Sequence, residues 1–179
     1  MEAAARGRRE PEQSVPSTAF EGFFRSEYPA VVRIAWSVVR DAHLAEDVAQ
    51  DVMIAARRRF PDPDGSGRPA AWVRTAAVHL GLNAVRGRRR RDERHRRMAA
   101  DGPMASAEEA ALDRQAEAEV RDALGRLPRR AATVLVLRHS GLSYAEVAAS
   151  MGVKVGHVGS MLRRAEAALR KEVGRATRS

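Results

Sequence analysis

Five side chains suited to contacting single-stranded bases recur at helical spacing in the first half of the chain. They stand 3, 4, 4 and 3 residues apart and so share one helix face: Trp72, Thr75, His79, Asn83 and Arg86. An aromatic ring stacks on an unstacked base, and the polar and guanidinium groups bind base edges and phosphates. The alternative is that Trp72 is mostly core, because tryptophan is highly buried on average, and that the others form a solvated face.

An arginine-rich stretch follows this face directly. Eight of the twelve residues from 86 to 97 are Arg, and only two are acidic. Such a stretch gives salt-dependent, sequence-independent affinity for phosphates. A solvated charged segment is the alternative, and it is the weaker one because so few acids offset the arginines.

A short acidic face lies upstream, on the helix expected from about residue 44 to 59. Its members point away from the apolar stripe of that helix: Glu46, Asp47, Gln50 and Asp51. Acids in a first turn favour the helix macrodipole, which accounts for Glu46 and Asp47 but poorly for Asp51. An acidic island on a basic chain predicts docking onto a basic protein surface.

Near the C-terminus the spacing predicts a helix-turn-helix. Ser143 and Glu146 form a capping box that opens a short helix, and Gly152 supplies a left-handed turn residue. The small and apolar offsets of the motif are all filled, by Val147, Ala148, Met151, Val153, Val158 and Met161. A plain helical hairpin with a glycine turn is the alternative.

The second helix of such a motif enters the major groove N-terminus first. Its exposed positions, with a turn residue before them, are Lys154, Gly156, His157, Ser160, Arg163 and Arg164. His157 and Ser160 are placed to reach base edges, whereas the lysine and the two arginines suit phosphates. The glycines at 156 and 159 either let DNA approach closely or are tolerated because packing holds the helix.

All of the regular structure expected from the sequence is helical. Apolar residues recur at helical spacing over about 20–39, 44–59, 70–86, 120–127 and 129–139, the last two separated at Pro128, and Pro29 either opens a second helix or bends the first. On the third segment the expected inward residues are Val73, Ala77, Leu80 and Ala84. The predicted fold class is all-α: two small helical domains joined by a flexible linker, the C-terminal one with the helix-turn-helix.

Charge and composition divide the chain of 179 residues. Two basic blocks flank an acidic stretch with little to bury, and seven of the eight aromatics lie before residue 73, which predicts two separate cores. The expected parts are a disordered N-terminal tail (1–18), a helical domain (19–97), an acidic flexible linker (98–116), a helix-turn-helix domain (117–173) and a tail (174–179). The net charge of +9 favours a nucleic-acid partner.

Several function classes are disfavoured by what the sequence lacks. There is no Cys, which excludes disulfides and thiolate metal sites and fits a cytoplasmic protein. No apolar run approaches the roughly 18 residues that span a bilayer, and no signal peptide is found, so we expect no membrane insertion. We expect neither an enzyme, a metal site nor a cofactor, because metal-ligand spacing and a phosphate-binding loop are missing and one acidic helix supplies too few ligands for Mg²⁺.

The order of these parts resembles a sigma factor of bacterial RNA polymerase, in the extracytoplasmic-function (ECF) group of the sigma-70 family. The motifs that carry the likeness are AEDVAQDV at 45–52, AWVR at 71–74, LPRR at 127–130 and GLSYAEVA at 141–148. Family members commonly carry Asn and Asp where this chain has His79 and Asn83, a departure that bears on the promoter sequence rather than on the class.

The resemblance implies a role for each face. Contact with the coiled coil of the largest polymerase subunit would fall to Glu46, Asp47, Gln50 and Asp51. Melting and holding the −10 element would fall to Trp72, Arg74, Thr75, His79, Asn83, Arg86, Arg88, Arg89 and Arg90. Reading the −35 element would fall to Lys154, Gly156, His157, Ser160, Arg163 and Arg164. The implied partners are core RNA polymerase, through this coiled coil and its flap region, promoter DNA and an anti-sigma factor.

We therefore expect a non-enzymatic promoter-specificity subunit, cytoplasmic and associated with the nucleoid when in holoenzyme. The rival prediction is a stand-alone helix-turn-helix regulator that binds duplex DNA without polymerase. That rival leaves the acidic face and the Trp72 face unexplained.

Overall fold

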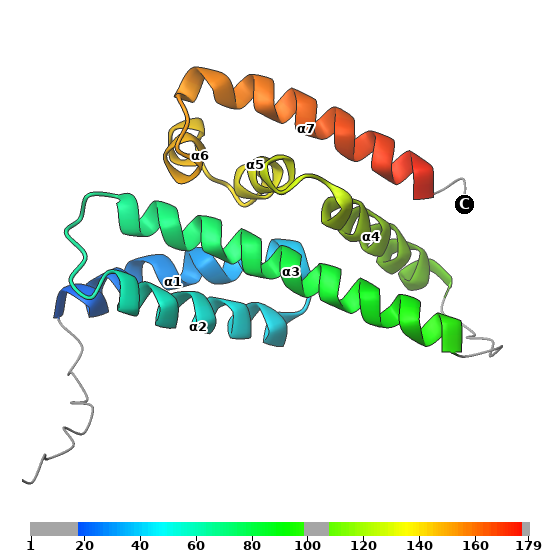
Figure 1. Ribbon diagram of the computed structural model, residues 1–179, viewed down its shortest axis with the longest axis horizontal. Coiled ribbons are helices and arrows are strands. Elements are labelled where there is room, and N and C mark those ends of the chain that lie inside the picture. Colours follow the sequence, from blue (N-terminus) through cyan, green and yellow to red (C-terminus); the bar gives the residue numbers. More distant parts are fainter. Residues whose placement is uncertain (1–17, 99–107, 177–179) are drawn as a thin grey trace, which may run out of the picture.

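The computed structural model describes residues 18–98 and 108–176. Residues 1–17 and 177–179 of the predicted tails and residues 99–107 of the predicted linker lie outside these ranges. Within them the chain is all-helical, as predicted, and has no strand. The helices, shown in Figure 1, are α1 (Thr18–Val39), α2 (Ala42–Arg59), α3 (Arg68–Met98), α4 (Glu108–Arg126), α5 (Arg129–His139), α6 (Tyr144–Met151) and α7 (Val155–Ala176).

The first three helices pack against one another and bury their apolar stripes. The fully buried side chains include Val31, Ile34 and Val38 from α1, Val52 from α2, and Val73, Val78 and Leu82 from α3. The prediction that Leu80 of α3 faces inward is wrong, because 36% of the surface of this residue is exposed. The buried stripe of that helix drifts to Val78 and Leu82, as expected when both α1 and α2 cover the same helix.

Local signals in the sequence fix the turn between α1 and α2. Pro29 lies inside α1 and does not start a new helix. The helix ends at Arg40, which has a left-handed φ of 53° and places its guanidinium 4.4 Å from the centroid of the Trp36 ring. Asp41 then caps α2 by accepting a hydrogen bond from the Leu44 N–H at 3.1 Å, and this bond, with one from Arg88, lowers the pKa of the Asp41 carboxyl.

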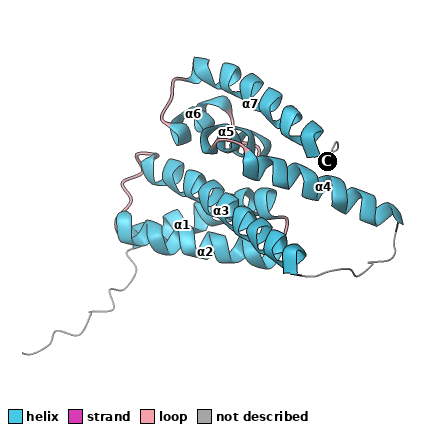
Figure 2. Ribbon diagram, turned by 45° about the vertical axis from the view of Figure 1, so that its right-hand side comes forward, coloured by secondary structure: helices cyan, strands magenta, loops and turns pink. Residues whose placement is uncertain are grey.

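The last four helices form a second layer on top of α3. In both views α7 lies farthest from α1 and α2, with α4, α5 and α6 between α7 and α3 (Figures 1 and 2). Val158, Leu162 and Ala165 bury the inner stripe of α7, and Leu135 and Leu137 bury that of α5. Outside this inner stripe, much of α7 is exposed to solvent.

Two helix boundaries differ from the predicted ones. The linker was expected to reach residue 116, but α4 already begins at Glu108. The stretch from 104 to 124 contains neither Gly nor Pro and is rich in Ala and Glu, so helix propensity outweighs its lack of apolar residues. Likewise α3 continues past residue 86 to Met98, because arginine is a good helix former.

The prediction of two separate cores is wrong for the described residues. Buried apolar side chains of both domains form one continuous cluster. Val85 of α3 and Leu127, next to α4, both belong to it. The shift in aromatic content along the chain thus marks two domains, but these domains share one apolar core.

Candidate nucleic-acid interface

The helix-turn-helix has the local structure that its sequence predicts. The Ser143 hydroxyl accepts a hydrogen bond from the Glu146 N–H at 3.3 Å, and the Glu146 carboxylate accepts one from the Ser143 N–H at 2.9 Å. The bonds that the Ser143 N–H and hydroxyl donate to the Glu146 carboxylate, and to a lesser extent the Arg74 charge, lower the pKa of Glu146. Gly152 ends α6 with a left-handed φ of 63°, and the Val153 N–H returns to the Ala148 carbonyl at 3.0 Å.

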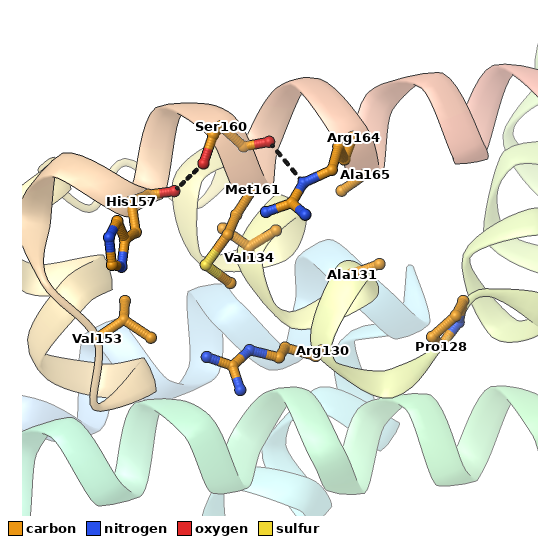
Figure 3. Close-up of a pocket in the computed structure, with 10 residues that line it drawn as sticks. All are labelled: Pro128, Arg130, Ala131, Val134, Val153, His157, Ser160, Met161, Arg164 and Ala165. Atoms are coloured by element: carbon orange, nitrogen blue, oxygen red, sulfur yellow. Dashed lines mark hydrogen bonds between the residues drawn. The ribbon is translucent and has the colours of Figure 1, made fainter.

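The second helix of the motif, α7, presents its predicted DNA-contacting residues to solvent. Five of the six are exposed: Lys154, Gly156, His157, Arg163 and Arg164. Ser160 is half-buried, and its hydroxyl donates to the His157 carbonyl at 2.9 Å. The Arg164 Nε donates to the Ser160 carbonyl at 3.3 Å, which holds that side chain back along the helix (Figure 3). The structure therefore brings these residues together on one open surface.

A hollow of about 580 Å³ lies between the start of α7 and the start of α5. His157 and Arg164 line it from α7, and Arg130 lines it from α5 (Figure 3). Met161 and Val134 form part of its apolar floor. Arg130 was not assigned to any site by sequence reasoning, and its distance of 27 residues from His157 leaves no spacing that could have revealed the proximity.

The predicted base-contacting face on α3 is formed, but it is not open. Trp72 is half-buried, with its ring edge-on to Phe60 at a centroid distance of 5.8 Å, and the Arg59 guanidinium lies 5.8 Å from its centroid. The Thr75 hydroxyl donates to the Ser150 carbonyl of α6 at 2.8 Å. Trp72 thus packs within the first domain, while Thr75 on the same face is hydrogen-bonded to the second domain.

The C-terminal half of this face, at Asn83 and Arg86, is also hydrogen-bonded to the second domain. Arg86 donates from Nε to the Gly125 carbonyl at 2.8 Å and from a terminal nitrogen to the Leu127 carbonyl at 3.1 Å. Asn83 is exposed and accepts a 3.5 Å bond from Arg129. Burial lowers the pKa of the His79 imidazole, and the nearby charges of Arg129 and Arg86 lower it further.

The arginine-rich stretch divides into paired and outward-facing residues. Arg88 lies 3.2 Å from the Asp41 carboxylate, and Arg89 lies 2.8 Å from Glu93 on the same helix. Arg90 is exposed on the face that Arg91 and Arg94 share. The helix therefore presents a strip of exposed guanidinium groups at Arg90, Arg91 and Arg94.

The acidic face on α2 is exposed throughout. Glu46, Asp47, Gln50 and Asp51 alternate with the buried Ala45, Val48, Ala49 and Val52. Beside Gln50 lies an apolar hollow of about 350 Å³ lined by Phe20, Phe24, Met53 and Ile54. Glu21, Arg25 and Arg57 line the same hollow, so its rim carries both charges, and the acidic face lies to one side of it. An acidic face suits a basic protein partner.

Neither a cluster of metal ligands nor a membrane-spanning helix is found among the described residues. No group of three or more His, Asp or Glu side chains in residues 18–98 and 108–176 is arranged to hold a metal ion. In the same part of the chain, no helix combines the length and the apolar character needed to span a membrane.

Comparison with known proteins decides the family. The model of sigma-70 region 2 matches residues 23–91, and the model of sigma-70 region 4 matches residues 117–169. The ECF RNA polymerase sigma factor SigM of Mycobacterium tuberculosis is 33% identical over 87% of this chain and 78% of its own length. The chain belongs to the ECF sigma factors. The RNA polymerase sigma-H factor of Pseudomonas aeruginosa is also 33% identical, over 74% of this chain and 75% of its own.

One solved structure shares the fold of this sigma factor. It is the sigma factor RpoE of Bartonella quintana in complex with the anti-sigma factor NepR, with a TM-score of 0.51 and 24% identity. The match covers 87% of this chain and 96% of the other. As a sigma factor, the chain acts in transcription initiation with RNA polymerase and promoter DNA, and its family is non-enzymatic. The acidic face and the α3 face both fall in region 2, and the exposed face of α7 falls in region 4.

Proposed function

We propose that this sigma factor binds core RNA polymerase through the acidic face of α2 and divides promoter recognition between α3 and α7. Glu46, Asp47, Gln50 and Asp51 dock onto the coiled coil of the largest subunit, with the neighbouring apolar hollow as part of the contact. Charge complementarity supports this, because an exposed acidic island on a basic chain selects a basic surface.

In the same proposal, α3 holds the non-template strand of the melted −10 element. Trp72 stacks on a base, while Thr75, His79 and Asn83 bind base edges, as their shared face supports. Arg74, Arg86 and the arginines Arg88, Arg89 and Arg90 bind phosphates.

The helix α7 reads the −35 element as duplex. His157 and Ser160 face the base edges at the N-terminus of the helix, and Lys154, Arg163 and Arg164 bind the flanking phosphates. Region 4 also docks on the polymerase flap. The observation that carries the proposal is that an open recognition helix and an acidic docking face lie on one chain.

The test is transcription from a genomic promoter library by purified core polymerase with and without this protein. We expect defined start sites that appear only with the protein and share blocks near −10 and −35. A variant with Glu46 and Asp51 changed to Arg is expected to lose these starts and keep its affinity for duplex DNA. If no starts appear and the protein alone shifts duplex DNA, the stand-alone regulator is the correct assignment.

A further inference from the structure

The hollow between the starts of α5 and α7 is lined by basic side chains and by no acidic one. Arg130 reaches it from α5, His157 and Arg164 reach it from α7, and all three are exposed to solvent (Figure 3). None of the residues that line it is Asp or Glu. Because no carboxylate of the lining neutralises the guanidinium groups, the hollow favours an anion.

Arg130 differs from the arginines close to it in sequence, which have partners inside the protein. Arg129 donates to the Asn83 side chain at 3.5 Å, and Arg126 lies 3.3 Å from the Glu172 carboxylate. Within residues 18–98 and 108–176, Arg130 makes neither a hydrogen bond nor an ion pair. All of its guanidinium donors are therefore available to a ligand in the hollow.

The side chains on the α7 wall of the hollow also keep donors free. Among the described residues, Arg164 bonds only the Ser160 carbonyl, through Nε at 3.3 Å, which leaves its two terminal nitrogens. The His157 imidazole has no hydrogen-bond partner in the same part of the chain. Donors from two helices thus converge on one open space (Figure 3).

Apolar side chains form the floor between these basic groups. Val134 of α5 and Ala165 of α7 are buried, and Met161 and Val153 are partly buried beside them. A basic rim over an apolar floor suits a sugar–phosphate chain, because the phosphate binds the rim while the deoxyribose packs on the floor. The hollow is open rather than enclosed, so it suits an extended chain better than a small molecule.

We propose that this hollow binds the backbone of one DNA strand beside the −35 element, with Arg130 as a phosphate-binding residue on the wall opposite Arg164. The proposal rests on the function proposed above, because it requires α7 to lie in the major groove of the −35 duplex. Phosphate contacts carry no sequence information, but they fix register and orientation. Arg130 therefore positions the recognition helix from α5, a helix that precedes the helix-turn-helix.

The test uses holoenzyme assembled from core polymerase and this protein, with a promoter fragment chosen from the start sites of the library. Arg130→Ala is expected to weaken promoter binding about two- to fivefold, the range of an exposed ion pair, and to reduce the salt-dependence slope by about 1. Arg130→Lys keeps the charge and should retain the slope. Arg170→Ala, which removes an exposed arginine of α7 that does not line the hollow, is the matched control.

Neutral methylphosphonates, placed one at a time at the phosphates that flank the −35 block, locate the contact on the DNA. One such position should weaken binding by the unaltered holoenzyme and have no further effect with Arg130→Ala, because both changes remove the same contact. The absence of any such position would overturn the proposal. A loss of affinity for core polymerase instead of promoter DNA would also overturn it, and would assign the hollow to a protein partner.

Failure of this inference can be told apart from failure of the proposed function. Arg130 is exposed and alanine is a good helix former, so the alanine variant should keep its helical circular dichroism and its thermal unfolding midpoint. If start sites appear and Arg130→Ala binds the promoter as Arg170→Ala does, only the role of Arg130 is wrong. If the unaltered protein gives no start sites with core polymerase, the proposed function is wrong, and this inference falls with it.

Discussion

The two predicted nucleic-acid faces of this sigma factor differ in what covers them. On α7, five of six predicted residues are exposed, and the sixth is half-buried. On α3, the corresponding donors bind α4 and α6, and Arg74 is 17% exposed. Helical spacing defines a face equally well in both cases. It does not say whether another part of the chain occupies that face, because this depends on contacts between residues about 40 to 75 positions apart.

The largest effect is expected from a change at Trp72, whose ring packs against Phe60 and Arg59 of its own domain. Trp72→Ala removes a stacking platform that is worth about 1–3 kcal/mol per base, so promoter-specific initiation should fall about tenfold or more. Trp72 is not part of the recognition helix, so affinity for −35 duplex should not change. Initiation is measured with core polymerase, and duplex affinity is measured with the free protein.

Trp72→Phe keeps an aromatic face and the contact with Phe60, and it serves as the control. Thermal unfolding of both variants shows whether the core has been disturbed. An alanine variant that folds normally and initiates normally would show that the ring is core and not a base platform.

A smaller effect is expected on the open face. Arg164→Ala should weaken duplex binding by the free protein uniformly across sequences and reduce its salt-dependence slope by about 1, as expected when one phosphate contact is lost. The measurement is a salt titration of duplex affinity. Arg170→Ala, which removes an exposed arginine further along the same helix, is the matched control and should leave the slope unchanged.

The contact between the two domains can be weakened at Glu146 without changing a residue of either face. Glu146→Gln keeps the capping box, because Gln also serves at that position, but removes the charge that faces Arg74. Affinity of the free protein for an oligo-dT strand should rise about two- to fivefold, within the range of a partly exposed ion pair. Unchanged affinity in a variant that retains its helical circular dichroism would show that the ion pair does not hold the domains together.

The smallest effect is expected from pH. Burial, Arg129 and Arg86 lower the pKa of His79 from its usual 6.5, so the imidazole resists protonation where it lies beside Arg129 of the second domain. Its contribution to the contact between the domains is therefore complete above pH 6.5 and declines as the pH falls below that value. Oligo-dT binding by the free protein should rise from pH 8 to pH 5.5 more than in a His79→Gln control. An identical pH profile in the two proteins would exclude this histidine as the cause.

Sequence reasoning predicted the local structure of the second domain well, because its signals are local. The capping box at Ser143 and the left-handed Gly152 lie within a few residues of the groups that they satisfy. The predicted start of α4 was too late. A linker and a polar helix have similar compositions, and here only the absence of Gly and Pro indicates a helix. Sequence reasoning also missed Arg130 and the pairing of Arg74 with Glu146, because packing and not spacing brings them to their partners.

Gly125, where α4 packs against α3, makes the contact between the two domains adjustable by a single side chain. An added methyl group at Gly125 would be in ordinary contact with Val85, whereas a longer chain would act as a wedge between the two helices. This position belongs to none of the surfaces proposed for DNA or polymerase. A lineage could therefore change how readily the two domains of the sigma factor separate, and so how strongly it competes for a limited pool of polymerase, while its promoter specificity stays the same.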